Sequence, residues 1–232
     1  MSKDLSIILS TYNEELFIED TLNIIKETFP ECEIILVDDN SNDQTIKKVE
    51  NLQINNLKII QRNQRGLASA FLVGLIYSSK NTLAWVDSNQ GILVKKFPQM
   101  IEYLKEYDIV LLSRYVEGGG DERTQKRILT SKIINKLCRL VLGNKIKDYT
   151  GSMFVMKKSC LKHVVPIAYG HGEFFIEFLY KAMKNNLKIK EVPFIQSKDQ
   201  EELSKTASSI IKFAILGLNY IVRVFLSLIR KN

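Results

Sequence analysis

The chain has 232 residues, of which 45% are apolar and 25% charged, and this is ordinary for a folded soluble protein of one large or two small domains. The net charge of +7 is uneven, because residues 1–116 carry −4 and residues 117–232 carry +11 when Lys and Arg are counted against Asp and Glu. A strongly basic second half favours an anionic partner such as nucleic acid, a phospholipid surface or a phosphorylated substrate. No uninterrupted apolar run reaches the length of about 20 residues that spans a bilayer, which argues against a transmembrane protein.

The three cysteines, Cys32, Cys138 and Cys160, are isolated and lack the spacing of metal ligands. An odd number of scattered cysteines indicates a reducing compartment, and we expect all three to pack in the core. The chain starts Met-Ser-Lys-Asp and enters an apolar run directly, which leaves no room for a signal peptide. We therefore expect a cytoplasmic protein.

The first 90 residues alternate between short apolar runs, typical of buried strands, and longer stretches typical of helices. The strands are expected at residues 5–9, 33–37, 57–61 and 83–86, and the helices at about 15–29 and 43–52, with a third ending near 79. Three strand–helix alternations with short connections imply right-handed crossovers and a parallel sheet.

The segment 34–45, I-I-L-V-D-D-N-S-N-D-Q-T, places two aspartates directly after four apolar residues. The apolar run predicts a strand buried on both faces, so Asp38 and Asp39 lie at its carboxyl end, where ligands bind in open α/β sheets. The two carboxylates either accept hydrogen bonds from a ligand's base or ribose, or they only end the strand and cap the next helix.

Polar residues also follow the first and fourth predicted strands, at 11–14 and 87–89. Since the carboxyl ends of parallel strands share one edge of the sheet, these groups together with Asp38 and Asp39 predict a nucleotide pocket. The chain has neither G-x-G-x-x-G nor a P-loop, which argues against a dinucleotide enzyme and an ATPase.

Four motifs carry a more specific resemblance: T-Y-N-E at 11–14, V-D-D-N-S-N-D-Q-T at 37–45, R-x-x-R-G-L-A-S-A at 62–70 and V-D-S-N at 86–89. In this order they resemble glycosyltransferase family two, and within it the dolichol-phosphate mannose synthase type. The second half continues the resemblance at the following positions: strand 109–115 ending in Ser-Arg-Tyr, Arg127, Ser131 and Asn135 on one helix, 148–152, Glu177, 191–193, and 204–205.

The resemblance implies the GT-A fold of nucleotide-diphospho-sugar transferases, a mixed, mostly parallel sheet flanked by helices. It implies an inverting hexosyltransferase domain over residues 1–205, followed by a carboxyl-terminal amphipathic helix over 206–232. The donor nucleotide-sugar would be bound by Thr11, Tyr12, Asn13, Glu14, Asp39, Arg65 and Gly66.

By the same resemblance, Asp87 and Asn89 would hold Mg²⁺ or Mn²⁺, and the catalytic residues would be Asp87, Arg114 and Arg127. The family has Asp where this chain has Asn89, and its downstream Gln falls on Gly91. An amide oxygen can ligate a hard cation but brings no charge, so we expect a weakened metal site.

The acceptor implied by the resemblance is a polyprenyl phosphate, whose oxygen is already ionised and needs no strong general base. Arg114 and Arg127 would hold its phosphate, because a guanidinium can engage phosphate through two parallel hydrogen bonds. The alternatives left open are a soluble or glycan acceptor, and a degenerate member that binds nucleotide or a partner without turnover; the loop 197–202 departs from the family pattern. Nucleic acid is not expected as a partner, since the basic half lacks interleaved aromatic residues.

Residues 206–229 are the most apolar part of the chain, interrupted by Lys212 and Arg223 and closed by Arg230 and Lys231. This pattern favours an interfacial helix that places a peripheral protein on the cytoplasmic face of a membrane. The alternatives are a helix packed in the core and a helix that pairs two copies into an oligomer.

Overall fold

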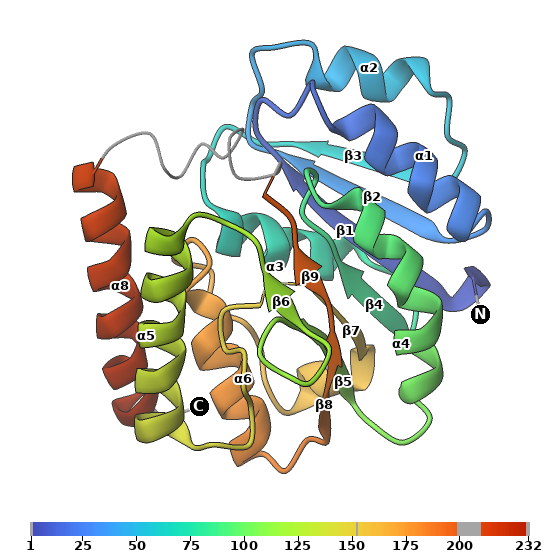
Figure 1. Ribbon diagram of the computed structural model, residues 1–232. Coiled ribbons are helices and arrows are strands. Elements are labelled where there is room, and N and C mark those ends of the chain that lie inside the picture. Colours follow the sequence, from blue (N-terminus) through green and yellow to red (C-terminus); the bar gives the residue numbers. More distant parts are fainter. Residues whose placement is uncertain (1, 152, 199–209, 231–232) are drawn as a thin grey trace.

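The computed structural model describes residues 2–151, 153–198 and 210–230, which form a three-layer α/β fold around one seven-stranded sheet (Figure 1). The strand order is β3-β2-β1-β4-β7-β5-β8. The strands are β1 (Leu5–Thr11), β2 (Glu33–Asp38), β3 (Leu57–Gln61), β4 (Thr82–Trp85), β5 (Ile109–Ser113), β7 (Phe154–Lys157) and β8 (Ile189–Pro193). β7 runs antiparallel to both β4 and β5, while the other neighbours pair in parallel. The predicted mixed, mostly parallel sheet is confirmed.

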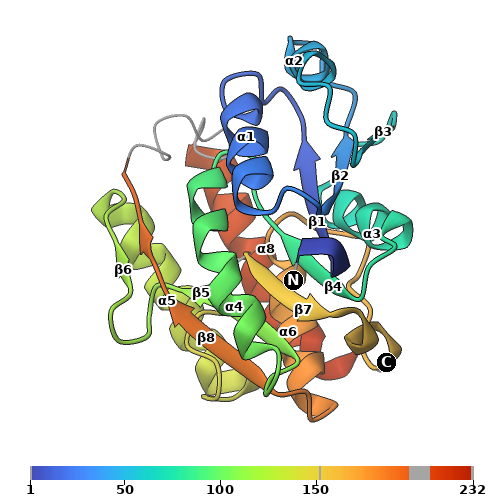
Figure 2. The same ribbon diagram turned by 90° about the vertical axis from the view of Figure 1, so that its right-hand side faces the viewer.

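Helices cover both faces of the sheet (Figures 1 and 2). They are α1 (Ile18–Thr28), α2 (Thr45–Asn51), α3 (Leu67–Tyr77), α4 (Phe97–Tyr103), α5 (Gln125–Leu142), α6 (Phe174–Lys184) and α8 (Ile210–Ile229), with 3₁₀ turns η1 (Ser2–Asp4), η2 (Gly91–Lys96) and η3 (Lys158–Lys162). One buried apolar cluster joins the sheet to α1, α2 and α4, and a second joins it to α3, α5, α6 and α8. The three cysteines are buried, as predicted.

The predicted strands agree with the structure within two residues, and β3 has the predicted bounds. The predicted helix starts at 15 and 43 were early. The amides of Phe17 and Ile18 both bond to the Glu14 carbonyl in a turn, and Asp43 Oδ1 accepts from the Thr45 amide and hydroxyl. The Asp43 side chain delays α2, because it competes with the first helical bonds, whereas the Glu14 carbonyl closes the turn that leads into α1.

The sheet's second half ends in a two-stranded parallel ribbon of β6 (Gly120–Asp121) and β9 (Ile195–Gln196). This ribbon follows β5 and β8 at their carboxyl ends, so it extends the same edge of the sheet that carries the polar groups of the first half (Figure 1).

Helix α8 packs against α5 and α6. Val224 is fully buried in the same cluster as α5 and α6, and the Arg223 guanidinium lies 2.9 Å from the Glu177 carboxylate of α6. None of the helices among the described residues is long and apolar enough to cross a membrane. The predicted boundary at residue 205, and the family-like Ser204-Lys205, lie outside the described residues.

Candidate active site

A cleft of about 940 Å³ lies at the carboxyl ends of β1, β2 and β4 and continues to α5 and α8. Ten of the predicted site residues line it: Thr11, Tyr12, Glu14, Asp39, Arg65, Gly66, Asp87, Asn89, Arg114 and Arg127. Asn13 is not in the cleft wall; its amide donates to Ser41 Oγ and its Oδ1 accepts from the Asn42 amide, each at 2.9 Å. It joins the turns after β1 and β2.

The two aspartates after β2 have different roles. Asp38 is fully buried and accepts from the Thr11 hydroxyl at 2.8 Å and from the Ser41 amide at 2.8 Å, so it ends the strand and shapes the turn. Asp39 faces the cleft, where it accepts from Arg62 Nε at 2.5 Å and from the Gly66 amide at 2.8 Å. Asp38 therefore has the strand-ending role that was one of the two interpretations of this pair, whereas Asp39 lies in the cleft wall.

The Asp39 end of the cleft also carries a flat aromatic surface. The Arg65 guanidinium lies 3.9 Å from the centre of the Tyr12 ring and donates a hydrogen bond to the Tyr12 hydroxyl. A planar cation, a phenol ring and a carboxylate suit a ligand with a flat base and hydroxyls, because each can stack on it or bond to its edge.

The segment after β4 brings Asp87 and Asn89 into the same cleft. The Gln90 amide bonds to the Asp87 carbonyl in a tight turn, and the buried Thr21 hydroxyl donates to the Ser88 carbonyl at 2.6 Å. At Gly91 a Cβ would lie 2.3 Å from Thr21 Oγ1 and 2.7 Å from Thr21 Cα, so no side chain fits there. The packing of α1 therefore explains why this position holds no ligand.

Asp87 and Asn89 together supply a carboxylate and an amide oxygen, which are ligands that Mg²⁺ and Mn²⁺ accept. The described part of the chain contains no group of three or more His, Cys, Asp or Glu side chains that could hold a metal. A cation here fits only if ligand and water oxygens complete its coordination shell.

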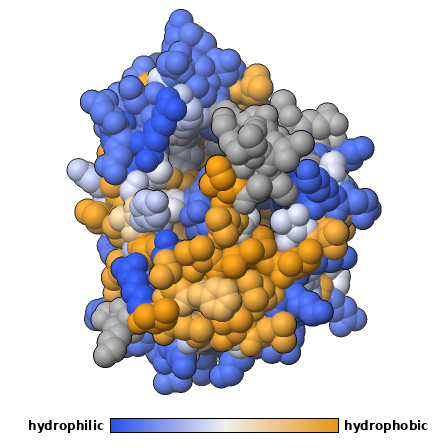
Figure 3. Space-filling view, turned by 90° about the vertical axis from the view of Figure 1, so that its left-hand side faces the viewer, coloured by the Kyte–Doolittle hydropathy of each residue, from blue (hydrophilic) through white to orange (hydrophobic). Residues whose placement is uncertain are grey.

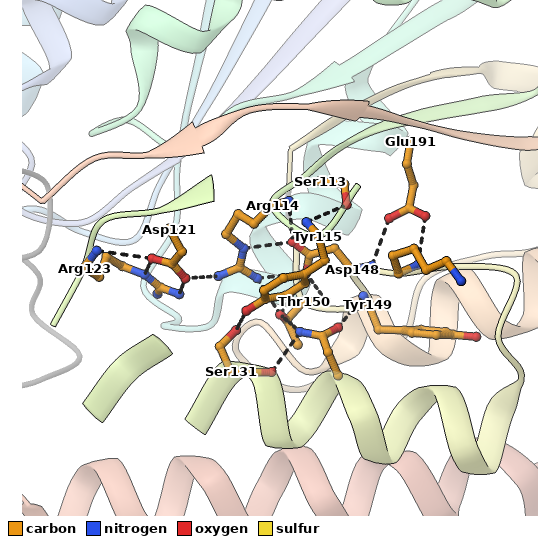
Figure 4. Close-up of polar contacts among 12 residues, drawn as sticks. Ser113, Arg114, Tyr115, Asp121, Arg123, Ser131, Asp148, Tyr149, Thr150 and Glu191 are labelled. Atoms are coloured by element: carbon orange, nitrogen blue, oxygen red, sulfur yellow. Dashed lines mark hydrogen bonds and ion pairs between the residues drawn. The ribbon is translucent and has the colours of Figure 1, made fainter. Parts of the chain in front are cut away.

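Arg114, at the other end of the cleft, is held by a buried network (Figure 4). Its Nε and one terminal nitrogen each donate to an oxygen of Asp148 at 2.8 Å, and that nitrogen also donates to Thr150 Oγ1 at 2.7 Å. Its other terminal nitrogen lies 3.7 Å from Asp121. Burial would raise the pKa of Asp148, but the Arg114 charge and the hydrogen bonds from Arg114 and Thr150 together outweigh burial and lower that pKa below its ordinary value.

The residues around this pair fix its geometry. Glu191 accepts the amides of Lys147 and Asp148 at 2.8 and 2.9 Å, and Asn135 Oδ1 accepts the Tyr149 amide at 2.7 Å. Three of the family-like motifs thus fix the position of Asp148, the partner of Arg114. They are Asn135 on α5, the segment that starts at Asp148, and Glu191.

Two more arginines lie in the cleft wall, Arg123 before α5 and Arg127 in its first turn. Arg123 donates from Nε and from a terminal nitrogen to the two oxygens of Asp121, at 2.8 and 2.6 Å. Sequence reasoning had not singled out Arg123; the Asp-x-Arg spacing after the glycine run was the available signal. Together with Arg114, these residues place three guanidinium groups on one side of the cleft.

Two other parts of the wall were not among the predicted site residues: the loop 169–173 before α6, and Leu216, Gly217, Asn219 and Tyr220 of α8. Glu177, which the resemblance singled out, is not in the cleft; it is buried and pairs with Lys181 and Arg223 at 3.0 and 2.9 Å. Its role in the structure is to attach α8 to α6.

Comparison with known proteins identifies the family and the fold of this chain. The model of the family Glycosyl transferase family 2 matches residues 6–165. A dolichol-phosphate mannosyltransferase of Pyrococcus furiosus is 30% identical, over 94% of this chain and 69% of its own, and a polyprenol monophosphomannose synthase of Mycolicibacterium smegmatis is 24% identical, over 90% and 83%. Glucosyl-3-phosphoglycerate synthase from Mycobacterium tuberculosis, solved in complex with Mn²⁺, UDP and phosphoglyceric acid, superimposes with a TM-score of 0.73 at 16% identity, over 97% of this chain and 78% of that one.

The fold and the cleft define a transferase of the GT-A class. The chain belongs to glycosyltransferase family 2, and the predicted family and enzyme class are confirmed.

Proposed function

We propose that this enzyme transfers a sugar from a nucleoside-diphosphate donor to a polyprenyl phosphate at a membrane surface. The observation that carries the proposal is that one cleft holds Asp39 and Asp87 at one end and three arginines at the other. The names of the dolichol- and polyprenol-specific relatives support a lipid phosphate as the acceptor. The alternatives to this proposal are a soluble or glycan acceptor, and nucleotide binding without transfer.

The donor's nucleoside would lie against Asp39, Tyr12 and Arg65, with its diphosphate toward Asp87. Asp39 keeps its orientation through the bonds from Arg62 and the Gly66 amide, so its oxygens need no rearrangement to accept from a ribose or base. Thr11, Glu14 and Gly66 complete this end of the cleft.

Mg²⁺ or Mn²⁺ bound by Asp87 and Asn89 would neutralise the negative charge that develops on the leaving diphosphate. With Asn in place of Asp the protein contributes a single carboxylate, and we propose that metal affinity depends strongly on the donor's own phosphate oxygens. Asp87 would act on the diphosphate only through such a cation, because the two anions repel each other, and the turn to Gln90 fixes the backbone that presents its carboxylate.

The acceptor phosphate would be bound by Arg127, with Arg114 and Arg123 adding positive charge beside it. Arg114 donates most of its N–H groups to Asp148 and Thr150, so few remain for the phosphate and its contribution is smaller than that of Arg127. The Ser131 hydroxyl lies one turn after Arg127 and also lines the cleft. Neither a strong base nor a covalent intermediate is needed for attack by an ionised phosphate oxygen.

The membrane contact would be the outer face of α8 with the neighbouring face of α5, called here the apolar face (Figure 3). Its members are exposed large apolar side chains: Leu129, Ile133, Leu140, Ile215, Leu218, Ile221, Val222, Phe225, Leu226, Leu228 and Ile229. Lys126, Lys132 and Lys136 of α5 are exposed beside it and would meet anionic headgroups. We propose a peripheral protein on the cytoplasmic face, with pairing of two copies through α8 as the alternative for this surface.

The test is transfer from a panel of UDP- and GDP-sugars to polyprenyl phosphate in vesicles, compared with soluble phosphorylated and glycan acceptors. Arg127→Ala should lower transfer to the lipid phosphate roughly ten- to a hundredfold, since a charge-assisted contact is worth about 1.5–3 kcal/mol. Lys47→Ala removes an exposed cation on α2, outside the cleft wall and away from the apolar face, and should stay near the wild-type rate. Transfer to the soluble acceptors alone would refute the lipid acceptor, and nucleotide binding without any transfer would refute catalysis.

A further inference from the structure

Helix α8 has two faces with different surroundings. Its outer face belongs to the apolar face, whereas Leu216, Gly217 and Tyr220 point inward and line the cleft. One turn further on, Arg223 is pinned to the buried Glu177 of α6. The same helix that we place on the bilayer is therefore also a wall of the active site.

Tyr220 meets the cleft at a glycine. A Cβ at Gly172 would lie 2.3 Å from the Tyr220 hydroxyl oxygen and 3.5 Å from Cζ, so the hydroxyl occupies the space that a side chain at 172 would need. Burial raises the pKa of Tyr220 above its ordinary value, with a further contribution from the charge of Glu173. The phenol therefore stays neutral and packs as a fixed, uncharged group.

The glycine belongs to a loop that reaches the donor end of the cleft. Glu173 is 3% exposed, and its Oε2 accepts from the His171 amide at 2.9 Å, which ties the loop to the start of α6. The Gly170 carbonyl accepts from the Ala68 amide at 3.2 Å, at the first turn of α3. Two residues before Ala68, the Gly66 amide donates to Asp39.

A continuous set of contacts thus runs from α8 through the loop 169–173 to α3 and Asp39. Hydrogen bonds hold the loop at its α3 end and at the start of α6, and at α8 it is held by the packing of Tyr220 on Gly172. Because the loop is part of the cleft wall, any displacement of it changes the shape of the donor site.

We infer that Tyr220 is a positioning residue for donor binding, which acts by seating its ring and hydroxyl on Gly172 and so holding the loop 169–173 against the start of α3. This inference rests on the proposed function, in which the Asp39 and Asp87 end of the cleft binds a nucleoside diphosphate. It gives α8 a role inside the active site in addition to its proposed contact with the bilayer.

The test adds volume at position 172, removes it at position 220, and then combines the two changes. Gly172→Ala should weaken binding of UDP or GDP, whichever the wild type binds with Mn²⁺, roughly tenfold, because the new methyl overlaps the hydroxyl. Tyr220→Phe, which leaves a gap, should weaken it about threefold. In the double variant the alanine methyl fills the space of the missing hydroxyl, so binding should return to within about twofold of the wild type.

Calorimetric titration gives the affinities, and thermal unfolding of the nucleotide-free proteins shows whether each variant is folded. Should Gly172→Ala not fold, the comparison of Tyr220→Phe with the double variant carries the test, since the added methyl should then improve binding. A double variant as weak as the two single changes combined, or a Gly172→Ala variant that binds like the wild type, would overturn the inference while leaving the proposed function intact. A wild type that binds neither nucleotide would overturn both.

Discussion

Arg114 and Arg127 carry the same charge, but their surroundings separate what each can do. Arg114 is 7% exposed and forms a two-bond pair with the fully buried Asp148, so it is part of the protein's interior framework. Arg127 is half-buried in the first turn of α5 and faces the cleft. Removing one partner of a buried pair typically costs about 3–5 kcal/mol of stability, so a variant at Arg114 reports on folding as well as on catalysis. A variant at Arg127 is therefore the better test of the proposed acceptor site.

Asn89 allows a residue-scale prediction about the metal. Asn89→Asp adds a second carboxylate beside Asp87, and we expect Mn²⁺ to bind roughly tenfold more tightly in the presence of donor nucleotide, because each added charge strengthens a hard-cation site. Titrating Mn²⁺ against nucleotide binding measures this shift. Gln90→Glu, at a neighbouring cleft position, is the control for added negative charge alone and should shift the curve less. Superimposable wild-type and Asn89→Asp curves would show that position 89 does not ligate.

The residues at strand ends could be predicted from sequence, because a buried apolar run fixes where the strand stops and therefore where the next polar side chains lie. This reasoning found Asp39 and Asp87. It could not separate Asp38 from Asp39, since that depends on which carboxylate turns inward to Thr11. Nor could it find Glu173 and Tyr220, which reach the cleft only because α6 and α8 pack as they do.

At the scale of elements, Glu33 joins three neighbours at the amino-terminal edge of the sheet. Its Oε2 accepts from Ser6 of β1 at 2.5 Å, and its Oε1 accepts from Lys58 of β3 at 2.7 Å and from the Ser79 hydroxyl after α3 at 2.9 Å. Burial alone would raise the pKa of Glu33, but these hydrogen bonds, led by that from Lys58, outweigh it and lower the pKa to about 2. The Glu33 carboxylate thus links β1, β2, β3 and the end of α3 at the edge of the sheet opposite the cleft.

The lowered pKa of Glu33 predicts how the free energy of unfolding depends on pH. A carboxylate with a folded-state pKa lowered from 4.5 to about 2 contributes stability that is present above pH 4.5 and is lost as the pH falls toward 2. Glu33→Gln should therefore lower the free energy of unfolding at pH 7 by about 1–3 kcal/mol, with a smaller difference from the wild type near pH 3. Urea unfolding at several pH values measures this. Glu31→Gln, a more exposed glutamate two residues away, should change stability by less than about 0.5 kcal/mol. A pH-independent loss in Glu33→Gln would mean that the charge is not involved.

At the scale of the whole molecule, the basic lysines of the second half and the apolar face lie on the same side. The basic second half contains α5 and α8, whose exposed apolar residues lie next to α5 lysines, and the cleft reaches between the same two helices. A lipid phosphate emerging from a bilayer against this face would meet Arg127 first and the donor beyond it. Deleting residues 206–232 would be a poor test, because it would remove the buried Val224 and leave Glu177 without Arg223.

Surface substitutions on α8 test the membrane contact without disturbing its buried face. Leu218→Ser together with Phe225→Ser should lower partitioning onto anionic vesicles at least tenfold, since full burial of each side chain is worth about 1.5–3 kcal/mol. Nucleotide binding should be unchanged, because neither residue lines the cleft. The matched control is Leu16→Ser with Ile76→Ser. Leu16 lies before α1 and Ile76 on α3, both are exposed, and this variant should partition like the wild type. Vesicle sedimentation measures partitioning, and sedimentation velocity without vesicles measures the oligomeric state. If the α8 variant keeps its vesicle binding but changes from dimer to monomer, the apolar face pairs two copies of the chain and the bilayer contact lies elsewhere.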